Sequence, residues 1–187
     1  MTLSIIPVHG IPEVRPRDDL VGLLLSALGA AGEKLVDGDV LVVAQKVVSK
    51  SEGRLVRLGD VVPGKRALEM AEESGKDARQ LEVVLGESKQ IVRWERGVLI
   101  VETRHGFVCA NAGVDRSNAG APDTVVLLPL DPDASAARIR DEIAAAAELV
   151  MGKLDRCPVA IVRGLSFEDS DETAQEYVRP AARDMFR

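Results

Sequence analysis

Residues 104–118 read Arg104-His105-Gly106-Phe107-Val108-Cys109-Ala110-Asn111-Ala112-Gly113-Val114-Asp115-Arg116-Ser117-Asn118, and they follow a strongly β-like run, Val98-Leu99-Ile100-Val101. Gly106 and Gly113 permit backbone conformations that are closed to other residues. The stretch also supplies a base, amides, a carboxylate, a guanidinium and a hydroxyl within a few positions. A strand that leads into a polar, glycine-punctuated turn is therefore expected here.

Asp115 and Asn118 lie three residues apart, just past the second glycine. A carboxylate in this position can hold a hard cation, and a neighbouring amide can orient a phosphate or a sugar. The alternative is an Asx-rich turn whose side chains accept hydrogen bonds from their own backbone. Composition alone favours the Asx-rich turn.

The bulk composition indicates a folded chain. Its 187 residues suffice for one large domain or two small ones, and 46% of them are hydrophobic. Aromatic residues make up only 3%, which argues against stacking platforms for single-stranded nucleic acid. A net charge of −6 disfavours a protein that binds the phosphate backbone of nucleic acid, but it leaves room for a nucleotide site.

The two cysteines, Cys109 and Cys157, fit neither a disulfide framework nor a zinc motif. The first residues carry no basic segment followed by an apolar one, so no signal peptide is predicted. No apolar run is long enough to cross a bilayer. We therefore expect a cytoplasmic protein with no membrane partner.

The pattern of apolar residues and turn signals predicts an α+β fold, because strands and helices do not alternate regularly. Strands are expected at 4–8, 40–43, 55–58, 90–94, 98–103, 124–130 and 157–162, and helices at 18–28, 63–74, 77–85 and 134–153. Asp18 or Asp19 is expected to cap the first helix, and Asp77 the third. Residues 44–50 are expected where a buried strand meets a loop. The sequence contains neither a Walker A motif nor G-x-G-x-x-G.

Three separate blocks resemble one family. They are Ile11-Pro12-Glu13-Val14, then Gln45-Lys46-Val47-Val48-Ser49-Lys50 with Glu52-Gly53-Arg54, and then the run from His105 to Asn118. Together they are similar to the coenzyme F420-0:L-glutamate ligases, also called F420-0:γ-glutamyl ligases. The resemblance covers residues 1–140 and resumes over residues 141–164.

The resemblance implies a reaction and its partners. These ligases use GTP to join the amino group of L-glutamate to a carboxylate of the deazaflavin coenzyme F420-0, and they release GDP and phosphate. It also implies Mg²⁺ or Mn²⁺ in an oxygen-rich site, K⁺ as a further cation, and a homodimer. No nucleic acid is implied.

The resemblance also assigns residues, although it identifies no catalytic one. Asp115 matches a metal ligand, and the nucleotide contacts match Asn118, Ile11, Pro12, Glu13, Val14, Gln45 and Lys50. The alternative for Glu13 is an ordinary loop carboxylate, and for Lys50 a solvated surface charge. His105 is expected to make a structural hydrogen bond.

The sequence departs from the family after Arg140, where a segment of several tens of residues with an Asp-Thr metal-binding pair is missing. Residues 134–153 are therefore expected to fuse two family helices, which could expose apolar surface. We expect a nucleotide- and metal-binding core at 1–130 and the remainder of a truncated second lobe at 131–187. The main alternative to a ligase is a non-catalytic remnant that binds GTP or F420. A folded domain of this family without any ligand is a further alternative.

Overall fold

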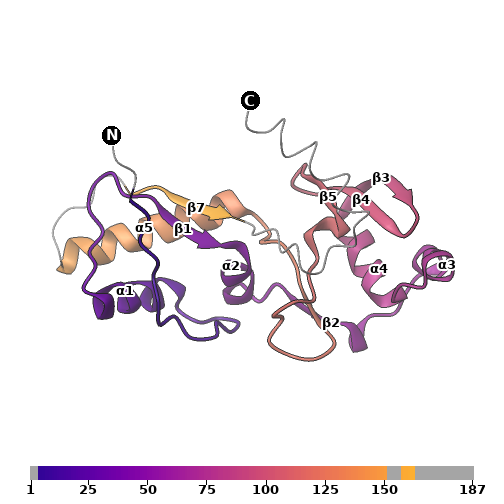
Figure 1. Ribbon diagram of the computed structural model, residues 1–187, viewed down its shortest axis with the longest axis horizontal. Helices are drawn as coiled ribbons and strands as arrows, with labels where there is room; N and C mark the ends of the chain where they lie inside the picture. Colours follow the sequence, from indigo (N-terminus) through magenta and orange to yellow (C-terminus); the bar gives the residue numbers. More distant parts are fainter. Residues whose placement is uncertain (1–3, 151–156, 163–187) are drawn as a thin grey trace. The chain divides into compact units, whose positions relative to one another are not determined.

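The computed structural model describes residues 4–150 and 157–162 (Figure 1). They form two compact units: residues 4–54, 128–150 and 157–162 make the first, and Leu55–Leu127 makes the second. Helices are combined with parallel and antiparallel sheets, so the predicted α+β class is confirmed. The chain passes from the first unit to the second after residue 54 and returns to the first after residue 127.

The first unit is built around a short parallel sheet. Its described elements are α1 (Leu20–Ala31), β1 (Leu41–Ala44), α2 (Gln45–Ser51), α5 (Pro132–Val150) and β7 (Val159–Val162). β1 pairs with β7 in parallel, from Leu41↔Val159 to Ala44↔Val162. The core of the first unit consists of Val14, Leu20, Val21, Leu24, Leu41, Val43, Val48, Ile139, Ile143 and Cys157.

Local capping explains where α1 begins and ends. The Asp19 carboxylate accepts a hydrogen bond from the Gly22 amide at 2.9 Å, which confirms one of the two predicted caps. Gly32, at φ 73°, ends the helix three residues later than the sequence suggested.

Helix α5 crosses the point where the sequence departs from its family. It runs without interruption from Pro132 to Val150, and the Asp131 carboxylate accepts from the Ala134 amide at its start. Ile139 and Ile143 lie on opposite sides of the junction and are both buried in the core of the first unit. Their spacing places them on one helix face. The continuous helix predicted across this junction is therefore confirmed as far as residue 150, and residues 151–153 lie outside the described part.

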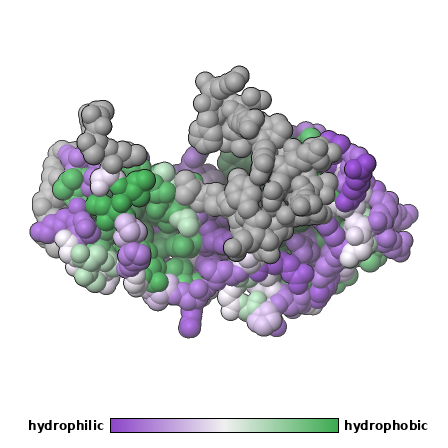
Figure 2. Space-filling model, in the orientation of Figure 1, coloured by the Kyte–Doolittle hydropathy of each residue, from purple (hydrophilic) through white to green (hydrophobic). Residues whose placement is uncertain are grey.

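The two faces of β1 differ in burial. Leu41 and Val43 pack into the core, whereas Val42 is 58% exposed, as is Val40, the residue before the strand, at 57%. Figure 2 shows hydrophobic residues gathered over the part of the first unit where β1 and β7 lie in Figure 1. Parallel sheets are usually covered on both faces, so this apolar surface is unusual.

The second unit consists of β2 (Leu55–Arg57), η1 (Leu58–Asp60), α3 (Lys65–Ser74), α4 (Ala78–Gly86), β3 (Ser88–Glu95), β4 (Val98–Thr103), β5 (Val108–Ala110), η2 (Asn111–Gly113) and β6 (Thr124–Val126). β2 pairs antiparallel with β6, and β3, β4 and β5 form an antiparallel sheet in that order. The core of the second unit consists of Leu58, Ala67, Met70, Leu81, Val84, Leu99, Val101, Ala112, Val114, Val125 and Leu127.

The β3–β4 hairpin turns through two residues with positive φ, Arg96 at 49° and Gly97 at 77°. This combination is typical of a type I′ turn, whose twist matches that of the flanking strands. The predicted hairpin with a left-handed glycine is thus confirmed.

Several local predictions were wrong or incomplete. Residues 4–8 form no strand, and Ile5 and Ile6 are exposed. Residues 45–50 belong to helix α2 rather than to a loop; its N-cap residue, Ala44, has no side-chain cap that could have signalled the start. Strand β5 was missed because Val108-Cys109-Ala110 is too short to show a period.

A strained turn connects β5 to Asp115. Asn111, Ala112 and Gly113 have φ values of 51°, 52° and 73° in succession. For an L-residue such as alanine the left-handed conformation costs roughly 1–2 kcal/mol. Ala112 is nevertheless buried in the core of the second unit, so the surrounding packing holds the turn in this shape.

Ala112→Val is expected to lower the free energy of unfolding by roughly 3 kcal/mol, because a β-branched residue tolerates neither the positive φ nor the packed site. Ala112→Gly should change it by less than about 1 kcal/mol, since relief of strain offsets the loss of a buried methyl group. Equilibrium urea unfolding measures both. Equal stability of the two variants would contradict the strained turn.

Candidate functional site

The first group of candidate residues centres on a buried lysine. Lys50, in α2, is only 4% exposed, so its interpretation as a solvated surface charge is wrong. Its ammonium contacts a carboxylate oxygen of Glu13 at 2.5 Å, and the Glu13 side chain is 51% exposed. A buried lysine keeps its charge only with a close partner. The structure thus brings together two candidates that are far apart in the sequence.

The other candidates of the first unit lie in the same loop and the same helix as this ion pair. In the loop before α1, Val14 is buried in the core of the first unit, Ile11 packs against that core, and Pro12 is exposed. Gln45 opens α2 directly after β1 and is buried, with its side-chain amide donating to the Ser49 hydroxyl at 2.5 Å. Gln45 and Lys50 are therefore buried polar residues of α2, and Glu13 of the loop contacts Lys50.

The second group lies in the loop between η2 and β6. Asp115 is anchored by two backbone hydrogen bonds with Val126, of 3.0 and 2.8 Å. One of its carboxylate oxygens accepts from the Ser117 amide at 2.7 Å, so the Asx turn expected as an alternative is present. A carboxylate has several acceptor positions, and this hydrogen bond does not by itself prevent it from holding a cation.

Asn118 follows in the same loop with φ 49°, a conformation that asparagine tolerates better than most residues. Its side chain is exposed. Asp115 and Asn118 thus lie in one loop of the second unit, whereas the lysine, the glutamine and the loop before α1 belong to the first.

Asp115 offers only part of a metal site. Among residues 4–150 and 157–162, no group of three or more His, Cys, Asp or Glu side chains could hold a metal ion. Mg²⁺ is commonly held by one or two carboxylates together with phosphate oxygens and water. The residues present therefore suit Mg²⁺ or Mn²⁺ only where a bound phosphate supplies further ligands.

A charged network that the sequence did not indicate lies beside this loop. The Arg79 guanidinium, in the first turn of α4, donates to Asp77 at 2.7 and 3.0 Å and to Asp123 at 2.9 and 3.2 Å. Arg116 lies 4.0 Å from Asp77 and 3.8 Å from Asp123. Hydrogen bonds from Arg79 hold the pKa of the Asp77 carboxyl below its ordinary value. Only the capping role of Asp77 was predicted, and it is confirmed by a hydrogen bond from the Arg79 amide.

His105 stacks its ring on that of Phe107, with centroids 5.7 Å apart. This contact lies in the turn between β4 and β5, where the Gly106 amide donates to the Thr103 carbonyl. The stacking indicates a structural role in the turn.

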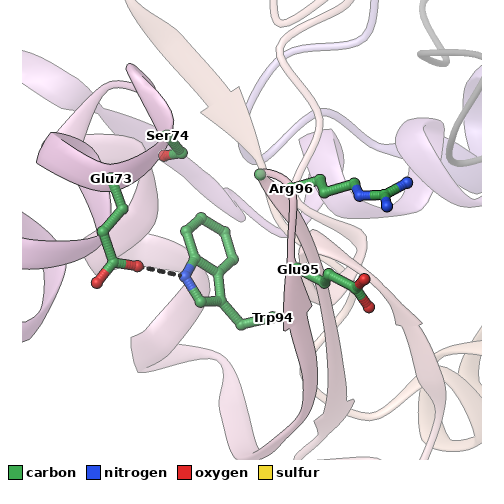
Figure 3. Close-up of a pocket in the computed structure, with 6 residues that line it drawn as sticks. Glu73, Ser74, Trp94, Glu95 and Arg96 are labelled. Carbon is green, nitrogen blue, oxygen red and sulfur yellow. Dashed lines mark hydrogen bonds between the residues drawn. The ribbon is translucent and has the colours of Figure 1, made fainter.

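A pocket of about 370 Å³ lies where the β3–β4 hairpin meets the end of α3 (Figure 3). The Trp94 indole donates to the Glu73 carboxylate at 2.8 Å across it, and Glu95 and Arg96 line the rim. Two carboxylates against one guanidinium do not favour an anionic ligand. This pocket contains none of the candidate residues.

Comparison with known proteins identifies relatives. The family model of F420-0:gamma-glutamyl ligase matches residues 10–145. The chain is 34% identical to the coenzyme F420:L-glutamate ligase of Methanothermobacter thermautotrophicus, with all of both chains covered. It is 35% identical to the enzyme of the same name from Methanopyrus kandleri, covering all of this chain and 98% of that relative. With the Archaeoglobus fulgidus enzyme of that name it shares 41% identity, over 76% of this chain and 55% of the relative.

The chain is shorter than these relatives. The alignment with the Methanothermobacter enzyme is 252 positions long, and this chain has 187 residues, so 65 positions (252 minus 187) have no counterpart in it. This agrees with the missing segment inferred from the sequence.

No helix in the described part of the chain is both long and apolar enough to cross a membrane. The family match spans every candidate residue, from the loop before α1 to Asn118. With a matched family model over most of its length and relatives aligned along all of it, this chain belongs to the F420-0:gamma-glutamyl ligase family.

Proposed function

We propose that this chain joins L-glutamate to coenzyme F420-0 in a GTP-dependent reaction. One observation carries the proposal: the family match over residues 10–145 includes every candidate residue in both units. The names of the relatives support the substrates, since each is called a coenzyme F420:L-glutamate ligase.

The chemistry requires activation, because a carboxylate is a poor acyl donor. A carboxylate oxygen of F420-0 attacks the γ-phosphorus of GTP, and the bond to the β,γ-bridging oxygen breaks to give GDP and an acyl phosphate. The glutamate amine then attacks the acyl carbon, loses a proton, and expels phosphate. The phosphate carries away one original carboxylate oxygen, and an amide between the F420-0 acyl carbon and the glutamate nitrogen remains.

The residues of this chain have separate roles in that scheme. The buried ammonium of Lys50 would bind the phosphates of GTP. In phosphoryl transfer, the charge on the transferred group is what most needs stabilisation. Asp115 would hold Mg²⁺ or Mn²⁺, which neutralises charge on phosphate oxygens when bound. Asn118, Gln45 and the loop of Ile11, Pro12, Glu13 and Val14 would contact the nucleotide. Binding of K⁺ and formation of a homodimer are part of the same proposal.

A second function is favoured by two observations. The described residues contain no cluster of metal ligands, and 65 alignment positions are missing. A chain in this state could bind GTP or F420 without turnover, as a non-catalytic remnant of the family.

The two functions are distinguished by incubating the chain with F420-0, L-glutamate, GTP and Mn²⁺. A ligase is expected to add one glutamyl residue to F420-0, as detected by mass spectrometry, and to release an equal amount of phosphate. Omission of L-glutamate or addition of EDTA should stop product formation. GTP binding without product would select the remnant, and neither binding nor product would contradict both functions.

A further inference from the structure

The loop that carries Asp115 and Asn118 is fixed at both ends by the backbone. At its start, Asp115 forms the two hydrogen bonds with Val126. At its end, the Asp123 carbonyl accepts from the Leu58 amide at 2.8 Å, and Thr124 begins β6. Residues 116–122 lie between these anchors.

Side chains provide a third attachment, to the first turn of α4. Two guanidinium nitrogens of Arg79 donate hydrogen bonds to the Asp123 carboxylate, and Arg79 also donates to Asp77. The opposite side of α4 is buried in the core of the second unit through Leu81 and Val84. The guanidinium thus connects the loop to an element that cannot move independently.

From these contacts we infer that Arg79 and Asp123 are positioning residues, which hold the 115–123 loop in the shape that presents Asp115 and Asn118 to the nucleotide. This inference rests on the proposed function for its effect on GTP, but the attachment itself can be tested without GTP. Asp123 has φ 53°, a conformation tolerated by aspartate, so the carboxylate is held where the arginine can reach it.

The planar guanidinium explains why an arginine occupies this position. Its donors form a rigid fork, and two carboxylates can share it with fixed directions. Exposed ion pairs contribute little to global stability, and here Arg79 is 36% and Asp123 42% exposed. Removing the pair should therefore leave the chain folded and change mainly the loop.

The test compares Arg79→Gln with Arg93→Gln. Arg93 is a matched control, because its guanidinium pairs with Glu95 on the same unit but on the β3–β4 hairpin. Arg79→Lys keeps the positive charge but loses the planar set of guanidinium donors that binds two carboxylates.

Hydrogen exchange followed by mass spectrometry gives the first result, without any ligand. In Arg79→Gln, amides of residues 116–123 are expected to exchange roughly tenfold faster, while Arg93→Gln leaves them unchanged. Arg79→Lys should fall between. Unchanged exchange in Arg79→Gln would overturn the attachment whatever the function proves to be.

Steady-state kinetics gives the second result. Arg79→Gln is expected to raise the KM for GTP about tenfold and to leave the KM for L-glutamate unchanged. Substitution of a residue that is only structural would lower kcat through loss of folded protein. It would not raise the KM for GTP while leaving the KM for L-glutamate unchanged. A chain that neither binds nor uses GTP would contradict the proposed function alone, since the exchange result stands independently.

Discussion

Asp115→Asn is expected to reduce GTP-dependent phosphate release by at least about 100-fold, because the substitution removes the carboxylate that would hold the divalent cation. Asparagine is chosen because its side-chain oxygen can still accept from the Ser117 amide and preserve the turn. The loss should therefore come from the missing charge rather than from a rearranged loop. Phosphate release at saturating GTP, F420-0 and L-glutamate measures it.

The control for this variant is Asp60→Asn, which alters an exposed carboxylate in η1 of the same unit. It should retain the activity of the unaltered chain. Both variants should show the same melting temperature within a few degrees. Full activity in a folded Asp115→Asn protein would refute the assignment of Asp115 as a metal ligand.

Lys50→Met is expected to weaken GTP binding roughly 10- to 100-fold, the loss typical of one charge-assisted hydrogen bond to phosphate. Methionine has nearly the length of lysine and suits the buried site. Exchange of a buried charge for an apolar side chain is often neutral or stabilising, and the half-exposed Glu13 carboxylate can be hydrated. Binding should thus fall while the free energy of unfolding stays the same or rises.

Two further variants separate a phosphate-binding lysine from a structural one. Glu13→Gln keeps a side-chain oxygen that can accept a hydrogen bond from the Lys50 ammonium, and it should weaken GTP binding less than Lys50→Met does. Lys34→Ala removes an exposed lysine of the same unit and should change nothing. Calorimetric titration with GTP gives all the affinities. A loss of stability without a loss of affinity in Lys50→Met would show that the ion pair is only structural.

Local signals in the sequence predicted much of the fold. Asp19 and Asp77 mark the starts of α1 and α4 because a short carboxylate side chain satisfies amides in the first turn. Gly97 marks the hairpin because a type I′ turn needs positive φ. These signals act within a few residues and need no knowledge of the rest of the chain.

The errors arise where tertiary packing decides the outcome. The apolar residues Ile5 and Ile6 resemble the start of a strand, but they pair with no described strand and remain exposed. In α2, Val47 and Val48 pack at the core of the first unit, and this burial stabilises a helix that has no cap. Neither effect can be read from a short stretch of sequence.

The candidate residues could be found by resemblance, but their surroundings could not. Nothing in the sequence shows that Lys50 is buried or that its partner is Glu13, since lysine is rarely buried and the two lie 37 positions apart. The same holds for Arg79 and Asp123, which are separated by 44 positions. Contacts at such separations depend on the completed fold.

The most direct test of ligation through an acyl phosphate is to run the proposed reaction with F420-0 labelled with ¹⁸O in its reacting carboxylate. If this shortened chain is a ligase, one ¹⁸O atom is expected in each phosphate released, and the mass of F420-0 should increase by one glutamyl residue. Unlabelled phosphate alongside product would contradict the acyl-phosphate route. Absence of both product and labelled phosphate from the folded chain would contradict the ligase function itself.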